Sequence, residues 1–255
     1  MLIRDFLRKH GWAVIMALIV AVFGVLIYFQ SNPKTALPFS PTNALRPVGY
    51  LPILPNRPQP KEITFNDCPP EGVGGDAELN LLKNRVDEGV YIPMSFDTIL
   101  NLTWPKNVEQ TNLKDWSTDG RAFIAQYAGI PVVMEGYFGA SMEAVPNSAN
   151  CNLASPADRD WNIYFTEYDR SEHSQAIIVT ITPRVRAKHI WNLDLMRKLI
   201  MDNHVPVRVS GWLLFNPQNP EDVGKTRATL WEIHPVMQIE LYQNGHWVQL
   251  DKAGD

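Results

Sequence analysis

The sequence lacks the short motifs that mark the common hydrolases and nucleotide-binding enzymes. It contains no G-x-S-x-G, H-E-x-x-H or Walker A sequence. Cysteine is scarce, and the two cysteines lack the C-x-x-C spacing of a zinc or redox site. Positive charge is also in deficit, with 23 lysines and arginines against 27 aspartates and glutamates. These absences leave no positive case for a motif-bearing enzyme, a cysteine-bound metal or a protein that binds nucleic acid.

What the sequence does contain is a long apolar run near its N-terminus. The run WAVIMALIVAVFGVLIYF opens residues 12–30, holds no charge, and follows three basic residues, Arg4, Arg8 and Lys9. At about 1.5 Å per residue, a helix of this length reaches roughly 27 Å, close to the ~30 Å hydrocarbon core of a bilayer. The positive-inside rule then predicts a cytoplasmic N-terminus at residues 1–11 and a transmembrane helix at 12–30 in contact with lipid. Everything after the helix is expected on the far side of the membrane.

The alternative interpretation of this run is a cleaved signal peptide. The apolar core of a signal peptide spans about 7–15 residues and ends at small residues. Here the run ends in bulky residues, Leu26 to Gln30 (LIYFQ), which favours a retained anchor. Residues 1–31 carry three basic residues and Asp5, a net charge of +2, so the whole-chain charge of −4 leaves −6 outside the membrane. An acidic domain of this kind is not expected to bind nucleic acid.

The two cysteines, Cys68 and Cys151, both lie on the predicted extracytoplasmic side. In an oxidising compartment, a lone pair of cysteines is most simply a disulfide. It would close a loop of about 83 residues, for which chain entropy predicts a stabilisation of roughly 4–5 kcal/mol. Two unpaired structural thiols are the alternative.

The rest of the chain divides by composition. Residues 31–61 form a linker in which repeated prolines favour an extended chain. Residues 62–125 are predicted to be an N-terminal extension with short helices, one of them capped by Asp76. Just before it, Gly72-x-Gly74-x-x-Ala77 matches a dinucleotide fingerprint, but the loop sequence Cys68-Pro69-Pro70 precedes it, so we interpret it as a turn. Residues 251–255 are a tail.

Residues 126–250 show the pattern of a small barrel. Mid-strand glycines, Gly136 and Gly139, suit a sharply bent first strand. The order strand, strand, strand, helix, strand, strand is typical of the oligonucleotide/oligosaccharide-binding (OB) fold, so we predict a mainly β chain with an OB-like Greek-key barrel. Another small barrel or a β-sandwich is the alternative. The expected strands are 132–142, 161–166, 176–182, 207–215 and 228–241, with a helix at 189–200 and a closing strand at 247–250.

Several stretches also carry a resemblance to a known group. They are Leu82–Arg85 (LKNR), Asp160–Tyr164 (DWNIY), Thr182–His189 (TPRVRAKH), Val209–Leu213 (VSGWL) and Thr229–Val236 (TLWEIHPV). Over roughly residues 67–250, the chain resembles a bacterial family of uncharacterised secreted or membrane-anchored proteins with an OB-like domain. The resemblance leaves the anchor and linker unmatched, and it implies the fold and a bacterial envelope setting. Together with the orientation of the apolar run, this predicts an anchor in the inner membrane and a periplasmic C-terminal domain. The resemblance implies no catalytic residues.

Four residues are candidates for chemistry. Glu232 and His234 lie two apart on one predicted strand and therefore share a face. His189, at the start of the predicted helix, and Asp160 could approach them and complete a His/carboxylate cluster for metal binding or acid–base work. The alternative is a buried histidine bonded to a backbone carbonyl, with Glu232 paired to an arginine. We predict no catalytic residue, metal or cofactor, and retain the four only as an alternative ligand-binding site.

A short basic run lies beside the predicted helix. Arg184, Arg186 and Lys188 alternate with other residues just before His189. Such a run either pairs with the acidic excess of the domain or forms an anion-binding patch.

These features favour a single-pass membrane protein whose extracytoplasmic OB-like barrel is an interaction module. We expect a non-catalytic accessory or scaffold subunit of an envelope complex, with other envelope membrane proteins as partners. The alternative is an envelope ligand-binding domain or hydrolase that uses the His/carboxylate cluster. A fold of this type hosts many functions and does not decide between them.

Overall fold

The computed structural model describes residues 63–109, 112–143, 145–201 and 205–252, all within one compact unit at residues 37–255. The predicted transmembrane helix at 12–30 and the linker at 31–61 lie outside the described residues. Of the helices in the described part of the chain, none has the length and apolar character needed to cross a bilayer.

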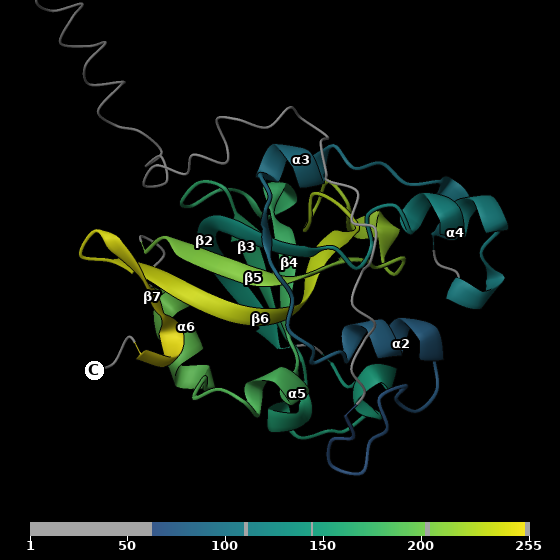
Figure 1. Cartoon of the computed structure of the whole chain (residues 1–255), viewed down its shortest axis with the longest axis horizontal. Helices are drawn as coiled ribbons and strands as arrows, with labels where there is room; N and C mark the ends of the chain where they lie inside the picture. The colour runs from purple at the N-terminus through teal and green to yellow at the C-terminus, as the bar shows by residue number, and fades with distance from the viewer. Residues whose placement is uncertain (1–62, 110–111, 144, 202–204, 253–255) are drawn as a thin grey trace, which may run out of the picture. The chain divides into compact units, whose positions relative to one another are not determined.

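The centre of the described unit is a closed five-stranded β-barrel (Figure 1). Its strands are β2 (Pro131–Glu143), β3 (Trp161–Thr166), β4 (Ile177–Ile181), β5 (Val207–Phe215) and β6 (Trp231–Gln243). They pair in the order β2-β3-β4-β6-β5, and β5 pairs back with β2. The β4–β6 pair is parallel and the other barrel pairs are antiparallel. This mainly β architecture agrees with the prediction and is compatible with an OB-like barrel.

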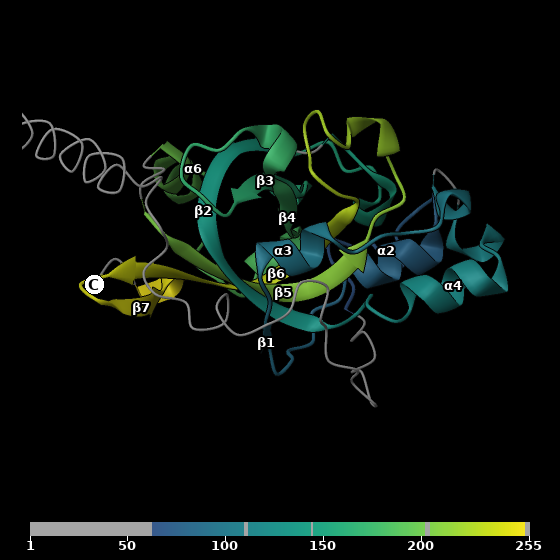
Figure 2. The same ribbon diagram turned by 90° about the horizontal axis from the view of Figure 1, so that it is seen from above.

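Closure of the barrel depends on the bend of β2. Its first half, Pro131 to Gly136, pairs with β5, whereas its second half pairs with β3 from Tyr137 onward. Gly136 lies where the partner strand changes. Only a glycine fits there, because a Cβ would lie 2.5 Å from the carbonyl oxygen of Thr166. The register with β3 then shifts between Phe138 and Ser141. Figure 2 shows β2 curving around one side of the barrel, as the mid-strand glycines predict.

Because side chains alternate along β3, β4 and β6, the barrel has an apolar interior and a polar patch on its outer face. Interior residues of β3, β4 and β6 belong to the main hydrophobic core: Ile163, Phe165, Val179, Trp231 and Ile233. The intervening residues point outward, as the period of two requires. Those outward residues are Asn162, Tyr164, Ile178, Thr180, Glu232 and His234. The register places Tyr164, Ile178 and Glu232 in one row across the three strands.

Residues 63–125 pack onto the barrel and share its core. Rings from this segment contact barrel rings: Phe96 lies 5.3 Å from Phe165, and Trp104 and Trp116 each lie 5.8 Å from Phe215. The segment contains α2 (Ala77–Lys83), β1 (Ile92–Pro93), α3 (Phe96–Leu100) and α4 (Thr118–Ile124). The predicted cap is confirmed, because the Asp76 carboxylate accepts hydrogen bonds from the backbone of Glu78 and Leu79.

A helix connects the third and fourth barrel strands, as predicted. After the short α5 (Pro183–Arg186), α6 (Leu193–Met201) begins four residues later than expected. The reason is a cap: the Asn192 side chain accepts a hydrogen bond from the backbone N–H of Leu195 at 2.9 Å. Strand β7 (His246–Gln249) extends β6 as a hairpin, and the predicted tail begins inside a 3₁₀ turn. The 3₁₀ turns are Lys106–Val108, Leu113–Asp115, Ser148–Asn150, Pro156–Asp158, His173–Gln175, Pro220–Asp222 and Leu250–Lys252.

Candidate functional site

A polar pocket of about 220 Å³ lies against the outer face of β3, β4 and β6. Its floor is buried and includes Lys83, Thr180 and Arg227, together with the outward residues of the three strands. Its rim is exposed and comes from the loops after β2 and β5, which contribute Val145 and Gln218 among others. The pocket is smaller than the 300–1,000 Å³ typical of drug-sized ligands, so it suits one small molecule or one unit of a polymer.

Glu232 and His234 meet in this pocket, as their spacing on one strand predicts. The Glu232 carboxylate is 2% exposed and has three donors: Asn216 at 2.9 Å, Arg227 at 3.2 Å and His234 Nδ1 at 3.2 Å. Burial acts to raise the pKa of Glu232, but the hydrogen bond from His234 and the charges of Arg227, His234 and Lys83 outweigh it. The pKa of Glu232 is therefore lowered to about 2. The carboxylate is ionised at neutral pH.

The orientation of His234 follows from its carboxylate partner. Because an ionised carboxylate can only accept, Nδ1 of His234 carries the hydrogen in this contact. The other ring nitrogen, Nε2, is buried and has no hydrogen-bond partner among the described residues. In the neutral ring, Nε2 is therefore an acceptor with nothing to accept from. Because His234 lines an open-rimmed pocket, a water molecule or a ligand can reach this atom and donate to it.

Lys83 reaches the pocket from the last turn of α2. In the described part of the chain, its ammonium donates to one group, Oε1 of Gln218 at 3.2 Å. Burial lowers the pKa of Lys83, and the nearby charges of Glu232 and Asp160 offset that effect only in part. The fold thus places the Lys83 ammonium where burial disfavours its charge, and two of its three N–H groups have no acceptor among the described residues.

Asp160 also lines the pocket, at the start of β3. It is 3% exposed, and both of its carboxylate oxygens are occupied. Asn150 donates to Oδ1 at 2.8 Å and Asn147 donates to Oδ2 at 2.9 Å. The loop after β2 therefore holds Asp160 in place.

His189 does not join the other three candidates. Its Nδ1 lies 2.6 Å from Asp251, in the 3₁₀ turn after β7, and its ring stacks on Trp191 with centroids 3.8 Å apart. Because α6 begins late, His189 lies in the preceding loop, where it contacts Asp251 in the 3₁₀ turn Leu250–Lys252. The structure thus unites Asp160, Glu232 and His234 but places His189 elsewhere. No group of three or more His, Cys, Asp or Glu side chains in the described residues could hold a metal.

One wall of the pocket is apolar. Tyr164 and Ile178 form a small buried cluster with Ala176, separate from the barrel core. His173 stacks on Tyr164 with ring centroids 3.9 Å apart. Burial, and then the charge of Asp222, raises the pKa of Tyr164, so its hydroxyl stays protonated at neutral pH. A ligand in the pocket would meet an aromatic ring on one side and polar groups on the other.

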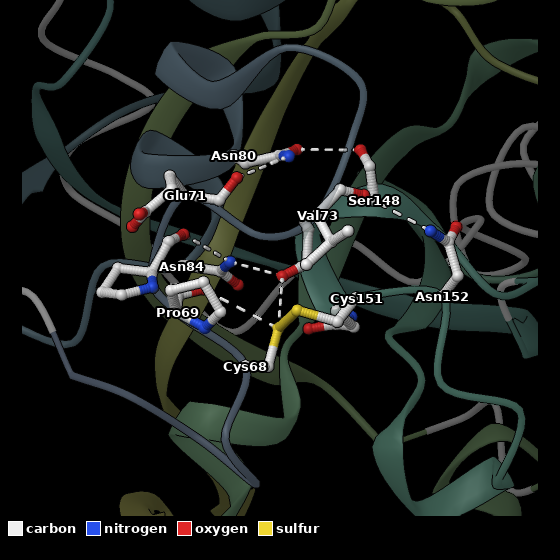
Figure 3. Close-up of a disulfide and its surroundings, with 12 residues drawn as sticks. Cys68, Pro69, Glu71, Val73, Asn80, Asn84, Ser148, Cys151 and Asn152 are labelled. Atoms are coloured by element: carbon white, nitrogen blue, oxygen red, sulfur yellow. Dashed lines mark hydrogen bonds between the residues drawn. A yellow bond between two sulfur atoms is a disulfide. The ribbon is translucent and has the colours of Figure 1, made fainter.

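A disulfide between Cys68 and Cys151 ties the N-terminal segment to the loop that carries Asn147 and Asn150 (Figure 3). Around it, the Asn84 side chain donates to the carbonyl of Ala149 at 2.7 Å. The two segments are so close that a Cβ on Gly72 would lie 2.0 Å from the carbonyl oxygen of Ser148, and its φ of +70° also favours glycine. The glycine motif is therefore a loop that packs tightly against Ser148 and leads into α2.

The basic run after β4 serves this same junction. Arg184 donates to the carbonyls of Cys68 at 2.9 Å and Pro69 at 3.0 Å, and Lys188 donates to the carbonyl of Val86 at 2.8 Å. Arg186 donates to the carbonyls of Ala157 and Arg159, and burial lowers the pKa of Arg186 to about 10. These side chains hold loops against the barrel. They hydrogen-bond backbone carbonyls, where the sequence suggested carboxylate partners or a bound anion.

Sequence reasoning did not assign Lys83 or Arg227 to the site. The alternative interpretation of the cluster pairs Glu232 with an arginine but does not indicate which one, and the structure shows that it is Arg227. For Lys83 the only signal is its place between Leu82 and Asn84 in the LKNR stretch, and that signal is weak. The role of Lys83 depends on the packing of α2 against β6, which no local pattern encodes. Comparison of the chain with models of protein families, with curated proteins and with solved structures finds no match.

Proposed function

We propose that this chain is a membrane-anchored, extracytoplasmic OB-like module that binds a small polar ligand, or one unit of a larger one, in the pocket on β3, β4 and β6. The observation that carries the proposal is the buried, unpartnered Nε2 of His234 on the floor of an open-rimmed polar pocket. Buried polar atoms are almost always satisfied in folded proteins, so a vacant one in a pocket favours a ligand.

The position of the pocket supports this proposal. OB barrels bind ligands on the face of their second and third strands, between the loop joining strands one and two and the loop joining strands four and five. Here β3 and β4 are the second and third barrel strands. The loop after β2 and the loop after β5 supply the rim. The OB-like interpretation and the pocket therefore support each other.

Binding is favoured over catalysis by the residue types in the pocket. The His234–Glu232 pair resembles the base and orienting carboxylate of a nucleophilic enzyme. Such an enzyme also needs a serine or cysteine beside the imidazole, and the pocket lining in the described residues contains neither. Thr180 donates its hydroxyl to Asn162 at 3.0 Å. We therefore propose a non-catalytic role for the imidazole.

The proposal retains the membrane anchor at 12–30 and the envelope setting. An accessory or scaffold role in an envelope complex remains a prediction, with other envelope membrane proteins as partners. Its test is the native mass of the full chain extracted from its own membranes in mild detergent, with co-migrating chains identified. Migration of the chain alone would reject the scaffold role and leave ligand binding as the function.

Ligand binding is tested by native mass spectrometry of the same preparation. We expect a small-molecule adduct on the wild-type chain that is lost in Thr226→Trp, because Thr226 lines the exposed rim and a bulky ring there blocks the mouth. Lys225→Trp is the matched control, an exposed neighbour outside the pocket lining. An adduct that persists in Thr226→Trp would reject this pocket as the binding site.

A further inference from the structure

We infer that the pocket ligand is a small hydroxylated monocarboxylate, such as a single sugar acid, whose carboxylate pairs with Lys83 and whose hydroxyl donates to His234. This inference rests on the proposed function and deepens it by naming the ligand class. It follows from an account of which hydrogen-bonding groups of the pocket floor are occupied and which are vacant.

The carboxylates of the floor are occupied. Each oxygen of Asp160 accepts from an asparagine, and each oxygen of Glu232 accepts from at least one donor. They are therefore poorly placed to bind an ammonium group or a metal on the ligand.

Two polar side chains of the pocket, Lys83 and Asn162, have hydrogen-bond donors without a partner in the described residues. The Lys83 ammonium has one partner, Gln218, within the described residues and two hydrogens left over. Asn162 uses its amide oxygen to accept from Thr180, which leaves its amide hydrogens for a ligand. Acceptor oxygens with negative charge satisfy such donors best, because a charge-assisted hydrogen bond is about twice as strong as a neutral one. A carboxylate meets this requirement.

His234 adds the opposite requirement. With Nδ1–H engaged by Glu232, the vacant Nε2 of the neutral imidazole accepts a hydrogen bond, so a ligand that binds this form carries a donor. A hydroxyl supplies it without adding a positive charge. Lys83 and His234 together thus select a molecule with both a carboxylate and a hydroxyl.

Charge and size limit the ligand further. Asp222 lines the pocket, and its carboxylate has no hydrogen-bond donor among the described residues. Its negative charge disfavours a doubly charged ligand such as a phosphate ester more than a ligand with one negative charge. The volume of about 220 Å³ excludes long ligands. Tyr164 and Ile178 offer a surface for the C–H face of a ring. A sugar acid combines one negative charge, several hydroxyls and such a face.

The test is isothermal titration calorimetry of the full chain in detergent micelles with three probes: glucuronate, glucose and propionate. We expect glucuronate to bind about tenfold or more tightly than either glucose, which lacks the carboxylate, or propionate, which lacks the hydroxyls. Equal affinity for glucose and glucuronate would overturn the carboxylate inference and leave ligand binding intact. Binding of none of the three would also overturn it, and the adduct experiment above then judges the pocket separately.

Two variants test which pocket residue contacts which group of the ligand. Lys83→Met should abolish the preference for glucuronate over glucose, whereas Lys106→Met, an exposed lysine outside the pocket, should leave it unchanged. His234→Asn keeps a donor for Glu232 but removes the Nε2 acceptor, so it should weaken glucuronate and glucose alike. A Lys83→Met protein that retains the full preference would overturn the assignment. The wild-type comparison of probes stands even where a variant fails to fold.

Discussion

At the scale of residues, the pocket floor is a set of charges that depend on one another. Glu232 lies between Arg227 and His234, and Lys83 adds a further positive charge nearby. Removing one member of a buried ion pair leaves the other charged and without compensation, which costs more than the pair contributed. Glu232 and Lys83 therefore differ in their expected effect on stability, since Glu232 is well satisfied and Lys83 is not.

Glu232→Gln should destabilise the protein by about 3–5 kcal/mol at neutral pH, because Arg227 loses its buried counter-charge. Denaturant unfolding of the full chain measures this loss. Glu172→Gln, at an exposed position, is the control and should unfold with the wild type. Equal midpoints for Glu232→Gln and the wild type would contradict the prediction.

The stability difference between wild type and Glu232→Gln should also depend on pH. The folded-state pKa of Glu232, about 2, lies below its ordinary value of 4.5. The carboxylate therefore contributes stability that is fully present above about pH 4.5 and is lost as the pH falls toward 2. Unfolding measured across this window should show the two curves converging. Parallel curves would show that Glu232 does not titrate as inferred.

Lys83→Met should leave the protein as stable as the wild type or more stable. The lowered pKa of Lys83 means that the folded environment disfavours its charge, and methionine fills similar space without one. Because the unfolded chain binds the Lys83 proton more tightly, wild-type stability should rise with pH below 10.5 relative to that of the variant. Denaturant midpoints at several pH values measure both effects. A large loss of stability in Lys83→Met would identify the lysine as a structural residue.

At the scale of elements, the loop after β2 joins three parts of the molecule. It carries Asn147 and Asn150, which hold Asp160 in the pocket, and Cys151, which is bonded to Cys68. Arg184, in α5, donates a hydrogen bond to the carbonyl of Cys68. The pocket wall is thus built on the junction between the N-terminal segment and the barrel.

The double variant Cys68→Ser/Cys151→Ser should lose about 2–5 kcal/mol of stability, since the disulfide closes a loop with a sequence separation of 83. Denaturant unfolding measures the loss. A reducing agent should lower the midpoint of the wild type to that of the variant and leave the variant unchanged. A wild type that is insensitive to reduction would contradict the disulfide.

At the scale of the whole molecule, the described residues share one core. Phe96, Trp104 and Trp116 from the N-terminal segment contact rings on β3 and β5. The segment that looks like an extension in the sequence therefore covers the barrel and contributes Lys83 to its pocket.

The N-terminal segment and the barrel should consequently unfold together. Hydrogen exchange of the full chain, followed by mass spectrometry at increasing denaturant, compares peptides from α4 with peptides from β5. We expect both to lose protection at the same denaturant concentration, because the packing of Trp116 on Phe215 joins them. Earlier loss in α4 would show that the segment is a separate cooperative unit.

Much of the barrel could be predicted because its signals are local. The β-branched and aromatic runs at 161–166 and 207–215 coincide with β3 and β5, and Gly136 marks the bend of β2. The pairing of Glu232 with His234 was likewise accessible, since two residues on one strand share a face wherever the strand lies.

The sequence by itself determined the elements, their order and the shared face of Glu232 and His234, because these depend on neighbours within a few residues. Only the tertiary structure decided which distant groups complete the pocket. Barrel closure and the packing of α2 bring Lys83 and Arg227 close to Glu232, whereas His189 contacts Asp251 in the turn after β7. Contacts of this kind arise from the burial of one common core, so their partners are chosen by the packing of the whole chain and are invisible to local pattern.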